Sequence, residues 1–177
     1  MQWPCERKTR MPDDEIRHME KHPPCCVGQD IAPASAELTE LIQADYGSNT
    51  TVFALRCSCG EDCSTVSLVQ DGFGPVSLKC ARCATQRTVF DPLKHGYDGA
   101  VGNNQGMEFG TPLVRPCPKC GASTFQVAAG FQYSGETDIL EHEELDIKPE
   151  DLFSWFVLGG KCSSCGQCTI LADIECA

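Results

Sequence analysis

The spacing of apolar residues changes near residue 50 and divides the chain into two kinds of segment. Before that point the apolar positions fit one face of a helix over about 33–46, with Gly47 as its stop. A shorter helix is predicted from Pro12, which three acidic residues follow, to the proline pair at 23–24. After residue 50 the apolar runs are short and bounded by turn residues, which is typical of strands.

These short runs predict seven strands, with a turn at 71–75 and a short helical turn at 148–151. The strands cover 51–56, 64–70, 76–79, 87–90, 124–133, 155–158 and 169–174. They fall into two groups that repeat one plan: a strand, a cysteine pair, a strand, an insertion, a strand, a second pair and a final strand. Residues 102–110 are rich in glycine and asparagine and favour a connector between the groups.

Fourteen cysteines interrupt this pattern, and eight of them form four closely spaced pairs. Two such pairs can enclose one metal ion in a tetrahedral shell of four sulfurs, which is the closed, structural type of zinc site. The sequence therefore predicts two bound Zn²⁺ ions. The ligands of the first site are Cys57, Cys59, Cys80 and Cys83, and those of the second are Cys117, Cys120, Cys162 and Cys165.

Glycine directly follows the second cysteine in three of the four pairs, at Gly60, Gly121 and Gly166. A metal knuckle turns the chain sharply at this point, and glycine adopts the positive φ of such a turn without steric penalty. The glycines therefore support metal knuckles rather than a chance spacing of cysteines.

The first site departs from the regular pattern. Its first pair is one residue shorter than the others, and Ala84 stands where the other pairs are followed by glycine. Cys63 is an alternative ligand in place of Cys57. We prefer Cys57, because Gly60 then follows the pair, and we expect Cys63 and Cys168 to be small buried residues.

This arrangement resembles the zinc-ribbon superfamily, whose rubredoxin-like knuckles occur in transcription factors, RNA polymerase subunits, ribosomal proteins and adaptors. The resemblance covers about 57–90 and 112–177 and lies in the knuckles alone. It implies zinc and a small β-fold, but no particular function, because ribbons serve many roles. Rubredoxins bind iron through the same four-sulfur shell, so iron is the minor alternative.

The predicted fold class is small, metal-bound and mainly β, with two zinc ribbons after a short helical N-terminal segment. We divide the chain into an N-terminal segment over 1–50, a first ribbon over 51–95, a connector over 96–111 and a second ribbon with an acidic insertion over 112–177.

The net charge narrows the choice of partner and compartment. The chain carries 14 basic and 25 acidic residues, a formal net charge of −11. Four thiolates outweigh one Zn²⁺, so each filled site adds about two negative charges. This charge disfavours nucleic acid as a partner. No apolar run reaches the ~20 residues of a membrane helix, and many cysteines without a secretion signal indicate a cytoplasmic protein.

Two further groups could carry metal or ion chemistry. His18 and His22 could form a third metal site with Cys25 and Cys26, but the prolines between them make an ordinary N-terminal segment the better interpretation. The acidic stretch at 141–146 lacks the spacing of a calcium loop and is interpreted as solvated.

A basic group surrounds the second knuckle of the first ribbon and is the candidate contact surface. Its members are Lys79, Arg82 and Arg87, with His95 in the segment that follows. His95 lies among turn residues, and neither a nucleophile nor a base–orienter pair accompanies it in the sequence.

These observations favour a non-enzymatic, zinc-binding protein-interaction module with two structural sites and another protein as its partner. The first alternative is a nucleic-acid or transcription-associated ribbon that makes contact through the first ribbon. The second alternative is an enzyme with a site near His95.

Overall fold

The computed structural model describes residues 13–28, 30–69, 74–102, 106–133 and 146–176, without the side chains of 13–16. The predictions for residues 1–12, for the turn at 71–73 and for the acidic insertion at 134–145 lie outside this range. The elements in chain order are α1 (Asp13–Lys21), η1 (Cys25–Val27), β1 (Ile31–Pro33), α2 (Ala36–Tyr46), β2 (Thr50–Leu55), β3 (Cys63–Leu68), β4 (Val76–Cys80), β5 (Gln86–Phe90), α3 (Gly96–Val101), β6 (Leu113–Val114), β7 (Thr124–Gln132), η2 (Pro149–Asp151), β8 (Trp155–Cys162) and β9 (Cys168–Glu175).

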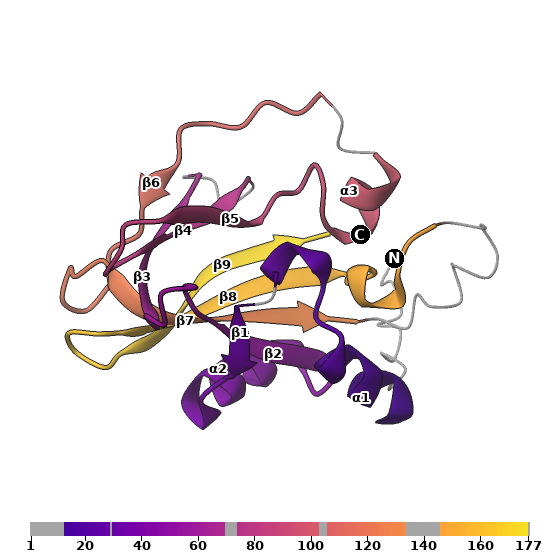
Figure 1. The fold of residues 1–177 in the computed structure, drawn as a ribbon, viewed down its shortest axis with the longest axis horizontal. Coiled ribbons are helices and arrows are strands. Elements are labelled where there is room, and N and C mark those ends of the chain that lie inside the picture. Colours follow the sequence, from indigo (N-terminus) through magenta and orange to yellow (C-terminus); the bar gives the residue numbers. More distant parts are fainter. Residues whose placement is uncertain (1–12, 29, 70–73, 103–105, 134–145, 177) are drawn as a thin grey trace, which may run out of the picture.

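The strands form one antiparallel sheet that curls into a half-barrel (Figure 1). β7 is its central strand. β8 pairs with residues 125–132 of β7, and β9 follows β8. On the opposite side of β7, β3 pairs with residues 124–126 and β2 with residues 127–132, so β2 and β3 lie end to end. The predicted mainly β fold class and its short N-terminal helix are confirmed.

The sheet contains one four-strand plan twice. We name β2 to β5 unit 1 and β6 to β9 unit 2. In each unit the last three strands form an antiparallel meander, β3-β4-β5 and β7-β8-β9. A β-bulge interrupts the last pairing at the same place in both, after Val76 in unit 1 and after Leu158 in unit 2. The repeat therefore extends from the cysteine frame to the backbone register.

The two units meet through their second strands. β3 and β7 are antiparallel, with Ser64 opposite Phe125. These two residues are equivalent in the repeat, because each pairs on its other side with the first cysteine of a knuckle, Cys80 or Cys162. An approximate two-fold axis thus passes between them. The first strand of each unit crosses this axis, β2 to pair with β7 and β6 to pair with β3.

Strands of both predicted ribbons thus share one sheet. How the chain divides into domains stays a prediction.

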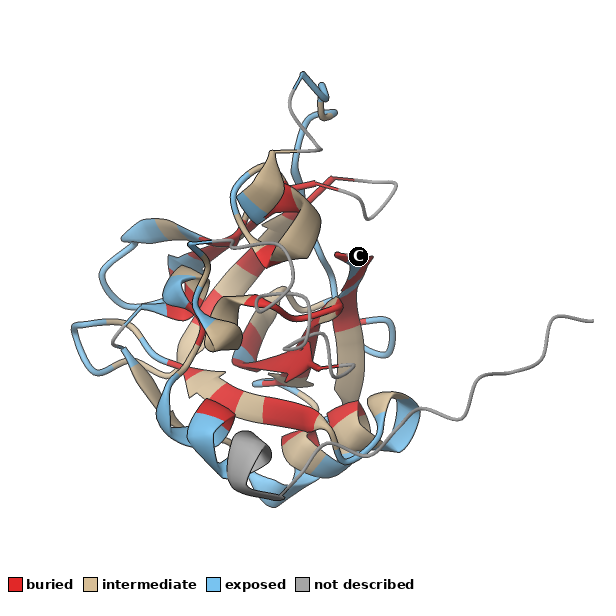
Figure 2. Cartoon of the chain, turned by 90° about the vertical axis from the view of Figure 1, so that its right-hand side faces the viewer, coloured by how far each residue is buried: buried red, intermediate tan, exposed pale blue. Residues whose placement is uncertain are grey.

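The inner face of the half-barrel carries a core rich in phenylalanine. Phe90 stacks on Phe156 with 4.4 Å between ring centroids, and Phe131 meets Phe153 edge-on at 4.8 Å. Such pairs contribute about 0.5–1.5 kcal/mol each beyond the area they bury. Figure 2 shows buried residues along the strands and exposed residues on turns and outer helix faces. The alternation of apolar and polar residues along the strands sets which face is buried.

Helix α2 covers the outer face of unit 2. Its residues Leu38 and Ile42 pack against Ala128 of β7 and Val157 of β8. The helix begins at Ser35, whose hydroxyl accepts a hydrogen bond from the backbone N–H of Leu38. Because the outer face is apolar where α2 crosses it, the helix buries its own apolar side there.

The equivalent outer face of unit 1 is polar. Where unit 2 has Ala128, Gly159 and Ile170, unit 1 has hydroxyl side chains: Ser67, Ser77 and Thr88. The hydroxyls of Ser77 and Thr88 lie 3.2 Å apart. A helix on this face would bury hydroxyl groups, so the side chains themselves explain why α2 covers one unit and not the other.

Four short elements were not predicted from the sequence: η1, β1, α3 and β6. Each has six residues or fewer. A segment of that length holds too few residues to show a hydrophobic period.

The close approach of α2 to the sheet depends on glycine. A Cβ at Gly130 would lie 2.6 Å from the Cγ2 atom of Ile42. We expect Gly130→Ala to lower the free energy of unfolding by about 1–3 kcal/mol. The matched background is Ile42→Ala, which removes that methyl group and in which the same change should cost less than about 1 kcal/mol. Denaturant titration of the four proteins measures both costs, and equal costs would contradict this packing.

Candidate metal centres

The first knuckle of each unit lies directly before its second strand. In both knuckles the glycine after the cysteine pair hydrogen-bonds back to the first cysteine, and the turn of unit 1 is one residue shorter. Gly60 N–H donates to the Cys57 carbonyl at 2.8 Å, and Gly121 N–H donates to the Cys117 carbonyl at 2.9 Å. The two glycines have φ values of 84° and 76°, in the left-handed region that glycine adopts without a Cβ clash. The shorter first pair of unit 1 is therefore accommodated without loss of the turn.

The second knuckle of each unit lies in the turn between its last two strands. Cys80 N–H donates to the Thr85 carbonyl, and Cys162 N–H donates to the Gln167 carbonyl, each at 2.9 Å. These bonds close equivalent turns that direct the thiols of each knuckle to the same side. The backbone of the two knuckles is thus organised by the strands and not by the cysteines alone.

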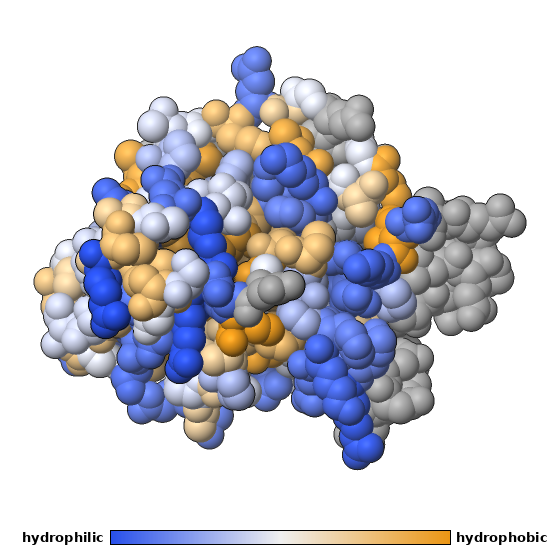
Figure 3. Space-filling model, viewed as in Figure 1, coloured by the Kyte–Doolittle hydropathy of each residue, from blue (hydrophilic) through white to orange (hydrophobic). Residues whose placement is uncertain are grey.

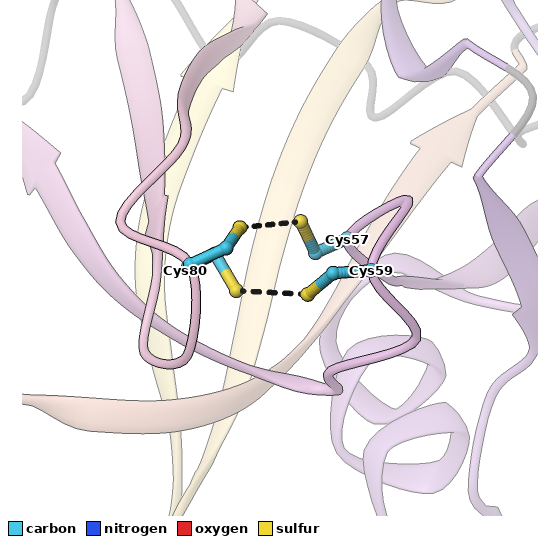
Figure 4. Close-up of side chains that lie close together, drawn as sticks. Cys57, Cys59 and Cys80 are labelled. Carbon is cyan, nitrogen blue, oxygen red and sulfur yellow. Dashed lines mark hydrogen bonds between the residues drawn. The ribbon is translucent and has the colours of Figure 1, made fainter.

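The structure brings together the four thiols of each predicted set. The ligand atoms of each set all lie within 4.8 Å of one another. In the first cluster, Cys57 and Cys59 come from one loop and point towards the knuckle that begins at Cys80 (Figure 4). Site 1 and site 2 are the names used below for the two clusters.

Distances between sulfur atoms fit a metal shell and not disulfides. In site 1 the Sγ–Sγ distance is 3.4 Å between Cys57 and Cys83 and 3.6 Å between Cys59 and Cys80. In site 2 the corresponding distances are 3.7 Å and 3.6 Å. A tetrahedral zinc–thiolate shell with Zn–S bonds of about 2.3 Å has edges of about 3.8 Å. A disulfide bond is about 2.05 Å long. Both clusters are therefore consistent with zinc-binding sites.

In each site nearby donors favour the thiolate form of one cysteine. In Cys59 and Cys120 a backbone hydrogen bond lowers the pKa, but hydrogen bonds with the other thiols and burial outweigh it and raise the pKa. In site 1 the hydroxyl of Thr85, together with its backbone N–H, lowers the pKa of Cys83 to about 6. In site 2 the backbone N–H of Cys165 makes the largest contribution to a pKa of about 6 for Cys162. A cysteine that is already deprotonated at neutral pH releases no proton when it binds a metal ion.

The two sites differ in exposure and in backbone strain. Site 2 has two buried cysteines, Cys117 and Cys162, whereas site 1 has one, Cys80. Ala84 of site 1 has a φ of 60° and is the one non-glycine residue with positive φ in the described part of the chain. Its N–H still donates to the Cys80 carbonyl, at 3.1 Å. Site 1 therefore forms the same turn in a less favourable conformation.

Cys63 and Cys168 lie outside both clusters. Both side chains are half-buried, and burial raises the pKa of each thiol. Cys168 packs against the cluster of apolar residues beneath α2. The structure thus places Cys57, and not Cys63, with the other three thiols of site 1.

The candidate contact residues near site 1 are partly engaged within the molecule. Arg82 pairs with Glu61 at 3.1 Å, and its guanidinium also donates to the Cys59 carbonyl at 3.4 Å. Arg87 donates to the carbonyls of Arg56 and Val27, at 2.9 Å and 3.4 Å. Lys79 is exposed on β4.

A hollow of about 110 Å³ lies beside site 1, and both Arg56 and Arg87 line it. The sequence pattern did not single out Arg56, which pairs with Asp62 at 2.9 Å across the gap between β2 and β3. The sequence separation of Arg56 and Asp62 does not predict this ion pair, because the fold of the knuckle between them brings the two side chains together.

His95 is placed by packing and hydrogen bonding at the start of α3. Its Nδ1 accepts a hydrogen bond from the backbone N–H of Asp91 at 2.9 Å, and its ring lies 6.0 Å from that of Phe90. Burial lowers its pKa, so the neutral ring that accepts this bond is favoured.

The four N-terminal candidates do not form a metal cluster among the residues that the structure describes. The rings of His18 and His22 stack with centroids 4.1 Å apart, and His18 Nε2 lies 3.6 Å from a Glu150 carboxylate oxygen. Cys25 N–H donates to Asp151 at 2.7 Å. Burial raises the pKa of Cys26. These contacts dock the N-terminal segment against η2.

Comparison with protein-family models, with curated proteins and with solved structures finds no match to this chain. Across the described residues, no helix combines the length and apolar character needed to cross a membrane.

The strain at Ala84 gives a matched pair of substitutions. We expect Ala84→Gly to raise the free energy of unfolding of the metal-loaded protein by about 0.5–1 kcal/mol, because glycine relieves the left-handed conformation. At the equivalent Gly166 (φ 72°) a Cβ would meet no atom within 4 Å, so Gly166→Ala tests conformation alone. It should lower the same quantity by about 1 kcal/mol. Denaturant titration measures both free energies of unfolding. If Ala84→Gly and Gly166→Ala changed the free energy of unfolding in the same direction, Ala84 would not be strained as we infer.

Proposed function

We propose that this chain is a zinc-stabilised, non-enzymatic protein-interaction module whose two four-cysteine sites are structural. The assembly of two separate four-thiol clusters carries the proposal. A shell of four sulfurs leaves no open coordination position for water or substrate, which is the property of structural zinc sites. The resemblance of the knuckles to those of zinc ribbons supports the same assignment.

Zinc is the metal that this donor set favours in a reducing cytoplasm. Four thiolates select soft or borderline ions, and tetrahedral sulfur shells hold zinc or iron. Iron remains the minor alternative. When bound, the metal would cross-link the two knuckles of one unit, Cys57 and Cys59 to Cys80 and Cys83 in site 1 and the equivalent pairs in site 2.

Metal content tests the first part of the proposal. We expect elemental analysis of the purified protein to give two zinc ions per chain, and Cys162→Ser to retain one. Cys63→Ser is the matched control and should retain two, since Cys63 lies outside site 1.

Removal of the metal should unfold the β portion, because structural zinc contributes about 10–16 kcal/mol of apparent binding energy. The measurement is the far-ultraviolet circular dichroism of the protein after treatment with a strong chelator. Full secondary structure in a sample verified to be free of metal would overturn the structural role.

Net charge supports a protein rather than a nucleic acid as the partner. Filled four-thiolate sites make the chain more acidic than its formal −11. Arg82 lies 3.1 Å from a Glu61 carboxylate oxygen, and Arg87 lies 4.0 Å from one of Asp30. These carboxylates partly neutralise the positive charge that would attract a phosphate group. Affinity capture from the native cell, with partners identified by mass spectrometry, tests the interaction role.

Nucleic-acid binding through unit 1 is the second candidate, and the exposed Lys79 beside Arg82 favours it. If it holds, single-stranded nucleic acid should bind with an affinity that falls steeply as salt is added. Combined Lys79→Ala and Arg82→Ala should then remove most of that binding, whereas Lys119→Ala in unit 2 serves as the control. Fluorescence anisotropy in a salt series measures both, and salt-independent or absent binding would exclude this candidate.

A further inference from the structure

Among the described residues, the outer edge of β6 is an apolar sheet edge with no strand paired to it. β6 pairs with β3 on one side (Figure 1). Leu113 and Val114 are 52% and 53% exposed. In the view of Figure 3 hydrophobic and hydrophilic residues are interspersed over the visible face. Among the described residues, these two and Met107 are the large hydrophobic side chains that are exposed.

The internal repeat shows what covers the equivalent edge of β2, the strand of unit 1 that corresponds to β6. Phe53 pairs with Ala129 of β7, and Leu113 pairs with the equivalent Leu68 of β3, so Phe53 and Leu113 hold the same position. Phe53 is 6% exposed. Strand β1 pairs with the outer edge of β2, with Pro33 opposite Phe53. In the described part of the chain, a strand thus covers this position on β2, whereas none covers it on β6.

Backbone direction makes the open edge competent to pair. Arg115 N–H donates to the Val66 carbonyl at 2.8 Å, so Arg115 directs its backbone groups towards β3. Because backbone groups alternate along a strand, Val114 directs its N–H and carbonyl outwards. The equivalent residue of β2 is Ala54, which pairs with Ala32 of β1.

Prolines limit how far an added strand can extend. Pro112 and Pro116 are the outward-facing neighbours of Val114, and neither has an N–H to donate. An added strand can exchange two hydrogen bonds with Val114, and the Pro112 and Pro116 carbonyls remain as acceptors. The edge is therefore restricted to a short segment in one register, and long sheet-to-sheet association is disfavoured.

The charge and the polarity of the surface around β6 indicate what kind of ligand could pair with its edge. Arg115 directly follows β6 and is exposed, in a chain of net charge −11. Strand β1 carries Asp30 directly before Ile31, at the end that would lie nearest Arg115 in the equivalent position. The outer face of unit 1 is hydroxyl-rich, which disfavours an added helix. The complementary ligand is a short extended segment with an acidic residue followed by apolar ones.

We propose that the edge of β6 binds an extended, acidic–apolar segment of a partner protein as an added antiparallel strand, in the way that β1 covers β2. This inference deepens the proposed interaction role and rests on it. The partner supplies the strand, and β6, the first strand of unit 2, supplies the edge centred on Val114.

The test uses the metal-loaded full chain and a peptide with the sequence of residues 30–35. Titration of the peptide into the ¹⁵N-labelled protein should shift the amide signal of Val114 more than that of Ala54. Val114→Pro removes the outward N–H without removing the Arg115 bond to β3, and should weaken binding by about 10-fold or more. Thr111→Pro, in the same exposed segment but outside β6, should leave the affinity unchanged.

Side chain and charge are tested in the same assay. Leu113→Asp should weaken peptide binding, and Met107→Asp, an equally drastic change at an exposed residue outside β6, should not. A peptide whose aspartate is replaced by lysine should bind more weakly. Two zinc ions per chain in every variant show that the fold is retained.

Three outcomes would overturn the inference. They are unchanged binding to Val114→Pro, peptide shifts that centre on Ala54 because β1 is displaced, and a concentration-dependent dimer that Val114→Pro makes monomeric. If a protein captured from cells binds Val114→Pro as well as the natural chain, the edge is excluded and the interaction role stands. If no partner is captured and no peptide binds, both proposals fail.

Discussion

The antiparallel register between β3 and β7 is the constraint on which the rest of the structure depends. With Ser64 opposite Phe125, each knuckle is set at a fixed distance from the axis that relates the two units. A shift of one residue would turn every side chain of one unit to the other face of the sheet. It would move Phe125 and Val127 out of the core.

Given this register, differences between the units follow from individual side chains. Unit 2 has small and apolar residues on its outer face, among them Ala128 and Gly159, and α2 lies against them. Unit 1 has serine and threonine at the equivalent positions and remains solvated. The metal sites differ in the same sense, since site 2 is more buried and site 1 accommodates a shorter knuckle and the left-handed Ala84.

Much of the fold could be predicted from the sequence, because its signals were local. Alternating apolar residues predict a strand over 124–133, and the structure has β7 at Thr124–Gln132. Gly47 predicts the end of the helix, and α2 ends at Tyr46. The two cysteine sets followed from spacing and from the glycines that follow them. The sequence did not reveal that β2 pairs with β7, because no local pattern in either strand specifies a partner so distant. The contacts of Arg87 were equally hidden, since they depend on the backbone carbonyls of Val27 and Arg56, which lie in other segments.

The exchange of first strands between the units has a consequence for how the chain acquires its structure. Thr50 pairs with Gln132 and Leu55 with Val127, a sequence separation of roughly 75 residues, and such distant contacts slow folding. During synthesis all four cysteines of site 1 emerge before any residue of β7. The newly synthesised chain can therefore assemble site 1 early. The edge of β2 that pairs with β7 has no partner until unit 2 has been synthesised.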